Sequence, residues 1–203
     1  MEKKSLILIA DVFRISLING LPCREDMILW ADNELKNSTE QSAWLSELSL
    51  SESRNVNDLI TLLDQKVGYT KPLVSARIVM GNLYRHLEVG SLRLEKVTQV
   101  LDWLARHSPL STEEKYIISG LDDKLQLAKS KTFGDVKDVE MEVRQFLQLF
   151  HEFSQYSEDE WVMASTKINL PLRAHFDLVR KEQAEFIEKQ KKSGWKSLWG
   201  LWK

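Results

Sequence analysis

Carboxylates are the most concentrated chemically active side chains in this chain, and they gather between residues 111 and 160. That stretch carries 12 Asp and Glu against 6 Lys and Arg. Its acidic clusters are Asp122-Asp123, Asp135/Asp138/Glu140/Glu142 and Glu158-Asp159-Glu160. Paired carboxylates can do acid–base or metal chemistry. First-turn charges and solvated helix faces explain most of these acids better. We therefore expect these acids to form a surface that attracts a basic partner, in preference to an active site.

The other residue types that carry chemistry form no motif. The histidines are His86, His107, His151 and His175. No two of them have the spacing of zinc ligands on a helix, and no glycine-rich phosphate loop is present. Cys23 stands at a predicted helix N-terminus, where the helix dipole would lower its pKa, or it is a small apolar residue in a helix–helix turn. We expect no catalytic residue, no metal and no cofactor, and predict a protein that is not an enzyme.

The last fifteen residues, Lys189–Lys203, combine tryptophan with positive charge. They hold five lysines, no acidic residue and three of the seven tryptophans. Read as a helix, Trp195, Leu198, Trp199 and Trp202 fall at i, i+3, i+4 and i+7, on one stripe. An exposed stripe of this kind would be a costly apolar patch. Three interpretations are open: the stripe folds back on the protein's own core, docks on a second copy or another protein, or contacts a membrane surface.

The composition narrows the class of protein further. The formal net charge is −2 and the pI about 6.1, and no predicted helix is rich in Arg, Asn and Gln, so we expect no nucleic-acid partner. The single cysteine, Cys23, suits a reducing compartment, and we predict a cytoplasmic location. No secretory signal is convincing, and no stretch approaches the roughly 18 apolar residues of a spanning helix.

Helical periodicity runs through almost the whole chain, which has only 8 Gly and 4 Pro. We predict an all-α fold, a compact bundle or irregular stack of eight to nine helices. The longer helices are expected at about residues 5–18, 22–35, 56–67, 72–89, 92–107, 112–129, 135–156 and 171–192, with a short helix near 158–163. The short apolar piece at 44–50 could be a short helix followed by a crossing loop. Residues 1–192 should form a single helical domain, and Gly194 should separate residues 193–203 as an amphipathic tail.

Local signals set several of the expected helix boundaries. Ser111 and Glu114 form a capping box, Asn55 and Asp135 are expected N-caps, and Gly20 stands where a C-cap is needed. The helix at 72–89 carries a wide apolar stripe, which predicts a central, largely buried position.

One stretch resembles a family of proteins. Trp30-Ala31-Asp32 ends the first helical hairpin, Trp44-Leu45-Ser46-Glu47-Leu48-Ser49-Leu50-Ser51 follows a dozen residues later, and Asp58-Leu59-Ile60 comes next. This pattern, over about the first 65 residues, resembles small uncharacterised all-helical bacterial proteins, some of them similar to immunity proteins that neutralise toxins. The resemblance implies a cytoplasmic protein that blocks a partner by surface complementarity. An acidic surface would suit inhibition of a basic enzyme such as a nuclease.

The expected function is therefore binding. The first hypothesis is a non-enzymatic protein–protein interaction module, immunity-like, whose partner is another protein or a second copy of this chain. The second hypothesis is a peripheral membrane-associated protein that docks through its Trp/Lys tail. The third is an enzyme with an unrecognised carboxylate or Cys23 site. The predicted partner-binding residues are Trp195, Leu198, Trp199, Trp202, Glu158, Asp159 and Glu160.

Overall fold

The predicted all-α fold is confirmed. The computed structural model describes residues 4–37, 42–68, 73–132, 134–153 and 160–200, apart from the side chains of residues 4, 160, 162, 186 and 189–200, and these ranges contain no strand. The helices are α1 (Lys4–Ile18), α2 (Arg24–Asn37), α3 (Ala43–Ser49), α4 (Val56–Val67), α5 (Leu73–Glu88), α6 (Leu94–His107), α7 (Thr112–Lys129), α8 (Val136–Gln148), α9 (Glu160–Lys167) and α10 (Asn169–Gly200). Ile168 alone separates α9 from α10.

Three helical hairpins, α1–α2, α5–α6 and α7–α8, turn in the same way. Two positions after the last residue of its first helix, each hairpin has a residue with positive φ: Gly20 at 59°, Gly90 at 68° and Lys131 at 56°. The next residue then donates its backbone N–H to the carbonyl five positions back, at 2.9–3.0 Å. This is the Schellman ending, which satisfies carbonyls that the helix itself cannot reach.

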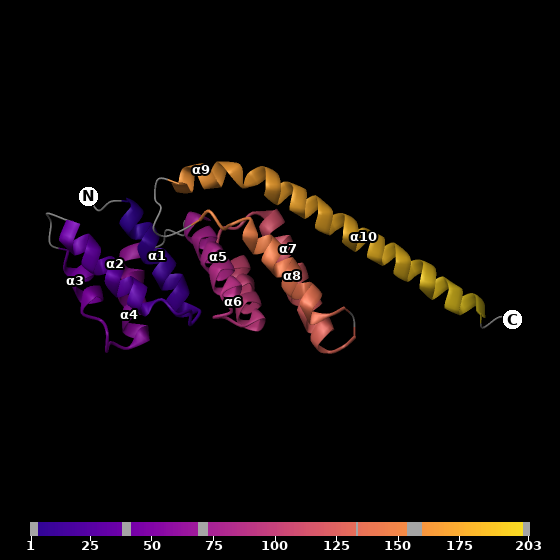
Figure 1. Ribbon diagram of the computed structural model, residues 1–203, viewed down its shortest axis with the longest axis horizontal. Helices are drawn as coiled ribbons and strands as arrows, with labels where there is room; N and C mark the ends of the chain where they lie inside the picture. Colours follow the sequence, from indigo (N-terminus) through magenta and orange to yellow (C-terminus); the bar gives the residue numbers. More distant parts are fainter. Residues whose placement is uncertain (1–3, 38–41, 69–72, 133, 154–159, 201–203) are drawn as a thin grey trace.

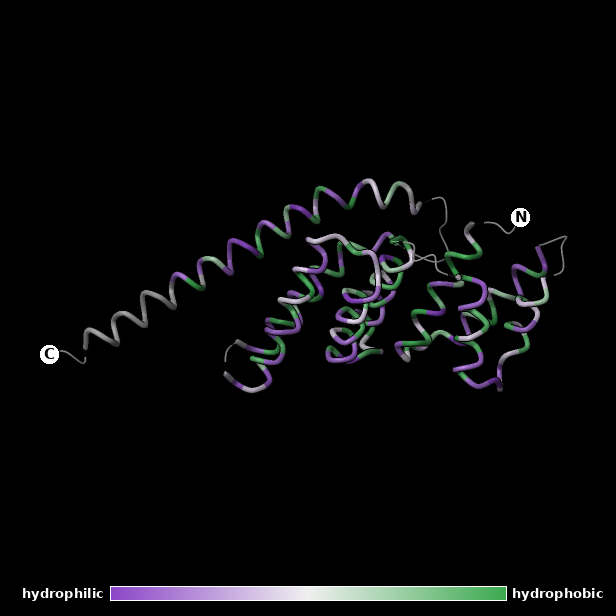
Figure 2. Tube along the Cα trace, turned by 180° about the vertical axis from the view of Figure 1, so that it is seen from behind, coloured by the Kyte–Doolittle hydropathy of each residue, from purple (hydrophilic) through white to green (hydrophobic). Residues whose placement is uncertain are grey.

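The helices line up as an irregular stack (Figure 1). Helix α1 packs on α4 and α5, α5 packs on α6 and α8, and α7 packs on α6, α8 and α10. Hydrophobic and hydrophilic residues alternate along the helices of the stack (Figure 2), as expected when each helix buries one face. Helix α10 crosses over the α7–α8 hairpin and continues past it, away from the N-terminal helices.

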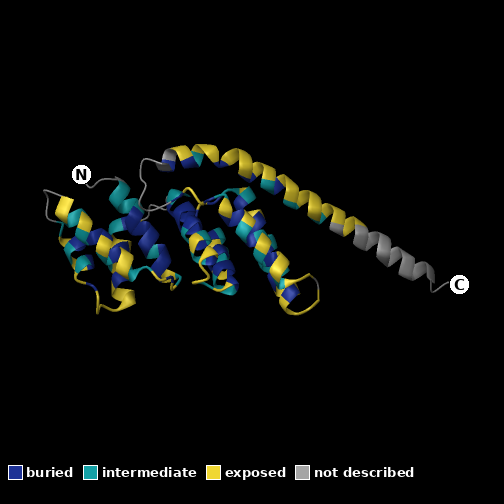
Figure 3. Ribbon diagram, viewed as in Figure 1, coloured by how far each residue is buried: buried dark blue, intermediate teal, exposed yellow. Residues whose placement is uncertain are grey.

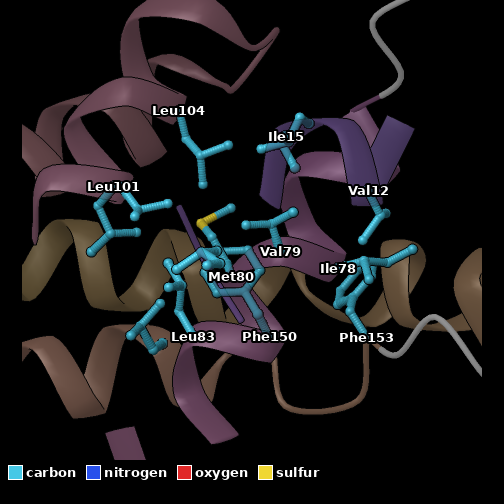
Figure 4. Close-up of a cluster of buried hydrophobic side chains, with 14 of the residues drawn as sticks. Val12, Ile15, Ile78, Val79, Met80, Leu83, Leu101, Leu104, Phe150 and Phe153 are labelled. Atoms are coloured by element: carbon cyan, nitrogen blue, oxygen red, sulfur yellow. The ribbon is translucent and has the colours of Figure 1, made fainter. Parts of the chain in front are cut away.

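Helix α5 is the centre of the core, as its wide apolar stripe predicts. Figure 4 shows Met80 and Leu83 of α5 packed among side chains from other elements, among them Ile15 and Leu104. The helix also comes very close to the chain that follows α8. A Cβ on Gly81 would lie 2.4 Å from the carbonyl oxygen of Phe153, so only glycine fits there.

A buried ion pair joins α5 to the start of α7. Nε of Arg77 donates to Oε1 of Glu114 at 3.0 Å, and the two side chains are 5% and 0% exposed. Oε2 of Glu114 accepts the backbone N–H of Ser111 at 2.7 Å, and the Ser111 hydroxyl accepts the backbone N–H of Glu114 in return. The predicted capping box is therefore confirmed, and its glutamate also neutralises a buried guanidinium.

The predicted end of α8 near residue 156 is wrong. The helix ends at Gln148, and the chain continues to Phe153 through tight turns. In these turns, the backbone N–H groups of Phe150 and Phe153 each donate to the carbonyl three residues earlier, at 2.9 Å. Arg85 of α5 donates to the carbonyls of His151 and Phe153 at 3.4 and 3.2 Å. A side chain distant in sequence thus takes carbonyls that a continuing helix would use.

The predicted break at Gly194 is also wrong, because α10 is helical without interruption from Asn169 to Gly200. A glycine inside a helix costs only about 1 kcal/mol relative to alanine, which is too little to end a long helix by itself. Residues 193–200 therefore continue the backbone of α10.

We expect Glu114→Ala to lower the free energy of unfolding by about 3–5 kcal/mol, because it leaves the Arg77 guanidinium buried without a counter-charge. The double variant Arg77→Met/Glu114→Leu should recover most of that loss, since both charges are then gone. Glu95→Ala, which breaks the exposed pair with Lys129, is the control and should cost less than about 1 kcal/mol. Urea denaturation measures all three; an equal loss for Glu114→Ala and Glu95→Ala would contradict the assignment.

Candidate functional site

Contacts with α7 hold the first half of α10 in place. Phe176 packs edge-on against the ring of Tyr116, with ring centroids 5.2 Å apart. The Tyr116 hydroxyl donates to Oε1 of Gln183, and Arg173 pairs with Glu113 at 3.1 Å. The two helices can approach closely because Gly120 faces Gln183, whose Nε2 would lie 3.1 Å from a Cβ on that glycine. These contacts fix α10 along one edge of α7.

Helix α10 leaves an open channel beside α8, with α7 as its floor. Two cavities, of about 260 and 410 Å³, adjoin each other there. Both are lined by Gly120, Lys124, Asp138, Glu142, Glu182 and Gln183. We call this continuous channel the α7–α8–α10 groove. Most described residues of α10 along it are exposed (Figure 3), so the helix covers the hairpin only in part.

The charge of the groove is strongly acidic. Five carboxylates line it, Asp123, Asp135, Asp138, Glu142 and Glu182, against one cation, Lys124. Nζ of Lys124 is already paired with Oε2 of Glu142 at 2.5 Å. Asp135 accepts the backbone N–H of Lys137 at 2.8 Å and so caps α8. Asp123, Asp138 and Glu182 are exposed, and their negative charges produce an electrostatic field that attracts positive charge.

Apolar side chains lie between these acids. Leu127 is 42% exposed, Met141 54% and Leu178 52%, and all three line the groove. Val139 is buried beneath them. Exposed apolar residues framed by charge are typical of a surface that receives a partner. The groove therefore suits a segment that carries both apolar and basic side chains.

His175 stands in the groove without adding positive charge. It is half-buried beside Phe146, with ring centroids 6.1 Å apart. Burial lowers the pKa of His175 below the ordinary value of 6.5, although Glu182 and Glu142 act in the opposite direction. The neutral ring is therefore the favoured form at neutral pH, and the acidic character of the groove is kept.

Of the two interpretations open for Cys23, the structure supports the small apolar residue in a helix–helix turn and not the activated thiol. Burial, followed by the charge of Asp26, raises the pKa of Cys23 to about 12. Cys23, Asp26 and His86 line a common cavity of about 260 Å³, but Nδ1 of His86 lies 2.8 Å from the Ser91 hydroxyl. Desolvation outweighs the dipole here, because the side chain packs against the core.

Within the described ranges, no three His, Cys, Asp or Glu side chains come together to hold a metal ion. Nor does any helix in those ranges combine the length and apolarity required to cross a bilayer.

The structure brings together some of the predicted acidic clusters. Asp123 of α7 and Asp135, Asp138 and Glu142 line the same groove, as a binding surface requires, whereas Glu140 pairs with Arg144. Glu182 and Leu178 of α10 also line the groove, and no pattern predicted this, because neither residue belongs to an acidic cluster or to the tail.

The seven predicted partner-binding residues are not tested. The side chains of Trp195, Leu198, Trp199 and Glu160 lie outside the described residues, as do Glu158, Asp159 and Trp202 entirely. The backbone places Trp195, Leu198 and Trp199 on the last turns of α10 and Glu160 at the start of α9.

Comparison with known proteins adds no relative. No protein-family model, curated protein or solved structure matches this chain. The function must therefore be inferred from the geometry and charge of the groove.

We expect Cys23 to react with iodoacetamide far more slowly in the native protein than in the unfolded chain. Raising the thiol pKa from 9.0 to about 12 lowers the thiolate fraction roughly a thousandfold at neutral pH, and the thiolate is the reacting form. Mass spectrometry of alkylation with and without guanidinium chloride measures both rates. Equal rates would show that the thiol is accessible and ionised in the folded state.

Acidification should destabilise the protein partly through His175. The folded state favours its neutral form, so the unfolded chain binds more protons below pH 6.5. The stability that neutral His175 provides is present above that value and is lost as the pH falls through it. Denaturation at about pH 7 and pH 5 should therefore show a smaller loss for His175→Gln than for the wild type. The same loss in both proteins would contradict this assignment.

Proposed function

We propose that this protein is a protein–protein interaction module that binds a basic, amphipathic segment of a partner in the α7–α8–α10 groove and does not act by catalysis. One observation carries the proposal: five carboxylates and a single, already paired lysine surround exposed apolar side chains. The raised pKa of Cys23 supports a role without nucleophilic chemistry.

The two components of the groove have different roles in binding. The carboxylates speed encounter with a cationic partner and fix its orientation, an effect that salt screens. Leu127, Met141 and Leu178 supply apolar area that water leaves when a partner docks, and this burial provides most of the affinity. A helix that presents apolar residues at i, i+3 and i+4, flanked by lysines, matches both components.

An immunity-like inhibitor is the specific form of this proposal that the resemblance of the first 65 residues suggests. Such a protein would block a basic enzyme by covering it, and the acidic groove has the required sign of charge. The single cysteine supports a cytoplasmic setting for this role.

Contact of α10 with a membrane surface is the alternative function, and one observation favours it. Helix α10 extends past the α7–α8 hairpin (Figure 1), and the chain from Lys189 to Lys203 contains five lysines and three tryptophans. Lysine near anionic lipid and tryptophan at the bilayer interface both stabilise peripheral binding.

A fluorescein-labelled peptide tests the groove. It is designed as an amphipathic helix, with leucines on one face and lysines on the other. Fluorescence anisotropy should show binding that weakens roughly tenfold in Asp123→Asn/Asp138→Asn and that weakens with added salt, since two exposed charges are lost. Glu25→Gln/Glu52→Gln removes the same charge from the other end of the protein and should bind like the wild type. An equal loss in both variants would show non-specific attraction and contradict the proposal.

A further inference from the structure

We propose that the segment held in the α7–α8–α10 groove is Lys189–Lys203 of a second copy of this chain, so that two copies exchange the ends of α10 in a reciprocal dimer. This rests on the proposed function, because it names the partner of the same groove. Four arguments lead to it: the opposite charges of the segment and the groove, the distance that the segment can reach, the helical register of α10 and the two-fold symmetry of the dimer.

The charge of the segment is complementary to that of the groove. Lys189–Lys203 contains five lysines and no acid, whereas the groove has five carboxylates and one lysine. The segment also places Trp195, Leu198 and Trp199 at i, i+3 and i+4, the apolar pattern that the exposed Leu127, Met141 and Leu178 can cover. One sequence therefore contains both the receptor and the ligand.

The segment cannot reach the groove of its own chain. Gln183 of α10 lines the groove, and α10 remains helical from there to Gly200. Each further residue moves about 1.5 Å along the helix axis, so Gly200 lies roughly 25 Å beyond Gln183. Figure 1 shows this half of α10 leading away from the α7–α8 hairpin. An occupant with this sequence must come from another molecule.

The helical register also separates the positions of Trp195, Leu198 and Trp199 from the face of α10 that packs on its own chain. Leu172 and Phe176 are buried, and with the half-buried Val179 they define the face of α10 that packs on its own chain. At about 100° per residue, the positions of Trp195, Leu198 and Trp199 centre roughly 125° around the axis from that face. These positions therefore do not continue the face that makes the intramolecular contact.

A two-fold axis makes the exchange self-consistent. If the α10 helices of two copies run antiparallel and cross near residue 189, then Trp195 lies beside Gln183 of the partner subunit, each six positions from the axis. The following turns of the segment then run along the part of the partner's α10 that lines the groove. Symmetry repeats the contact, so both grooves are filled in one closed dimer.

Charge exchange between variants tests the dimer in the full chain. The groove variant Asp123→Lys/Asp138→Lys and the tail variant Lys191→Glu/Lys192→Glu should each be monomeric by light scattering at a concentration where the wild type is dimeric. Mixing the two variants should restore the dimer, because both contacts then join opposite charges. Circular dichroism melts confirm that each variant is folded. The control Glu25→Lys/Glu52→Lys should remain dimeric.

The outcomes separate this inference from the proposed function. A monomeric wild type whose groove still binds the Lys/Leu peptide, with loss in Asp123→Asn/Asp138→Asn, would overturn the dimer and leave the interaction module intact. A dimer that survives both charge variants would overturn the exchange. A monomer that ignores the peptide but sediments with phosphatidylserine vesicles, and loses this in Lys191→Glu/Lys192→Glu, would overturn both proposals in favour of membrane contact.

Discussion

The buried pair of Arg77 and Glu114 is the constraint from which the placement of the site follows. A buried charge without a partner is strongly unfavourable, so the start of α7 has to stay where its glutamate meets the guanidinium of α5. Helix α7 in turn contacts α6, α8 and α10. The pair thus ties the central helix of the core to the helix that forms the floor of the groove, and the same carboxylate closes the capping box that begins it.

The groove exists because the apolar face of α10 is narrow and short. Leu172 and Phe176 commit this helix to α7, and Gln183 contacts α7 farther along, where Gly120 allows close approach. Leu178 of α10 lines the groove but stays 52% exposed, so α10 covers α8 only in part. The acids of α7 and α8 therefore keep their solvation, which carboxylates need unless they are paired, and Leu127 and Met141 stay partly exposed beside them. Because α10 covers the α7–α8 hairpin only in part, an acidic channel with apolar side chains remains beside it.

Helix positions were predictable from sequence wherever local chemistry decides them, and not where distant residues intervene. Asn55, Ser111 and Asp135 cap α4, α7 and α8 as predicted, because an N-cap depends on backbone groups two or three residues away. The end of α8 depends on Arg85, more than sixty positions earlier, and no local pattern contains that information. The local sequence left two interpretations of Cys23 open for the same reason, since burial is a property of the whole fold and here outweighs the local dipole.

For a related reason, the sequence predicted only part of the site. The acidic stretch and the basic Trp-rich end were each evident, but their relation depends on α10, which places Glu182 and Leu178 against α7 and α8. That one helix both completes the groove and continues into a segment of opposite charge. Because self-association would fill the groove as concentration rises, a different partner has to bind more tightly than Lys189–Lys203 or meet the protein when it is dilute. The tail then sets the threshold of affinity that a basic partner must exceed.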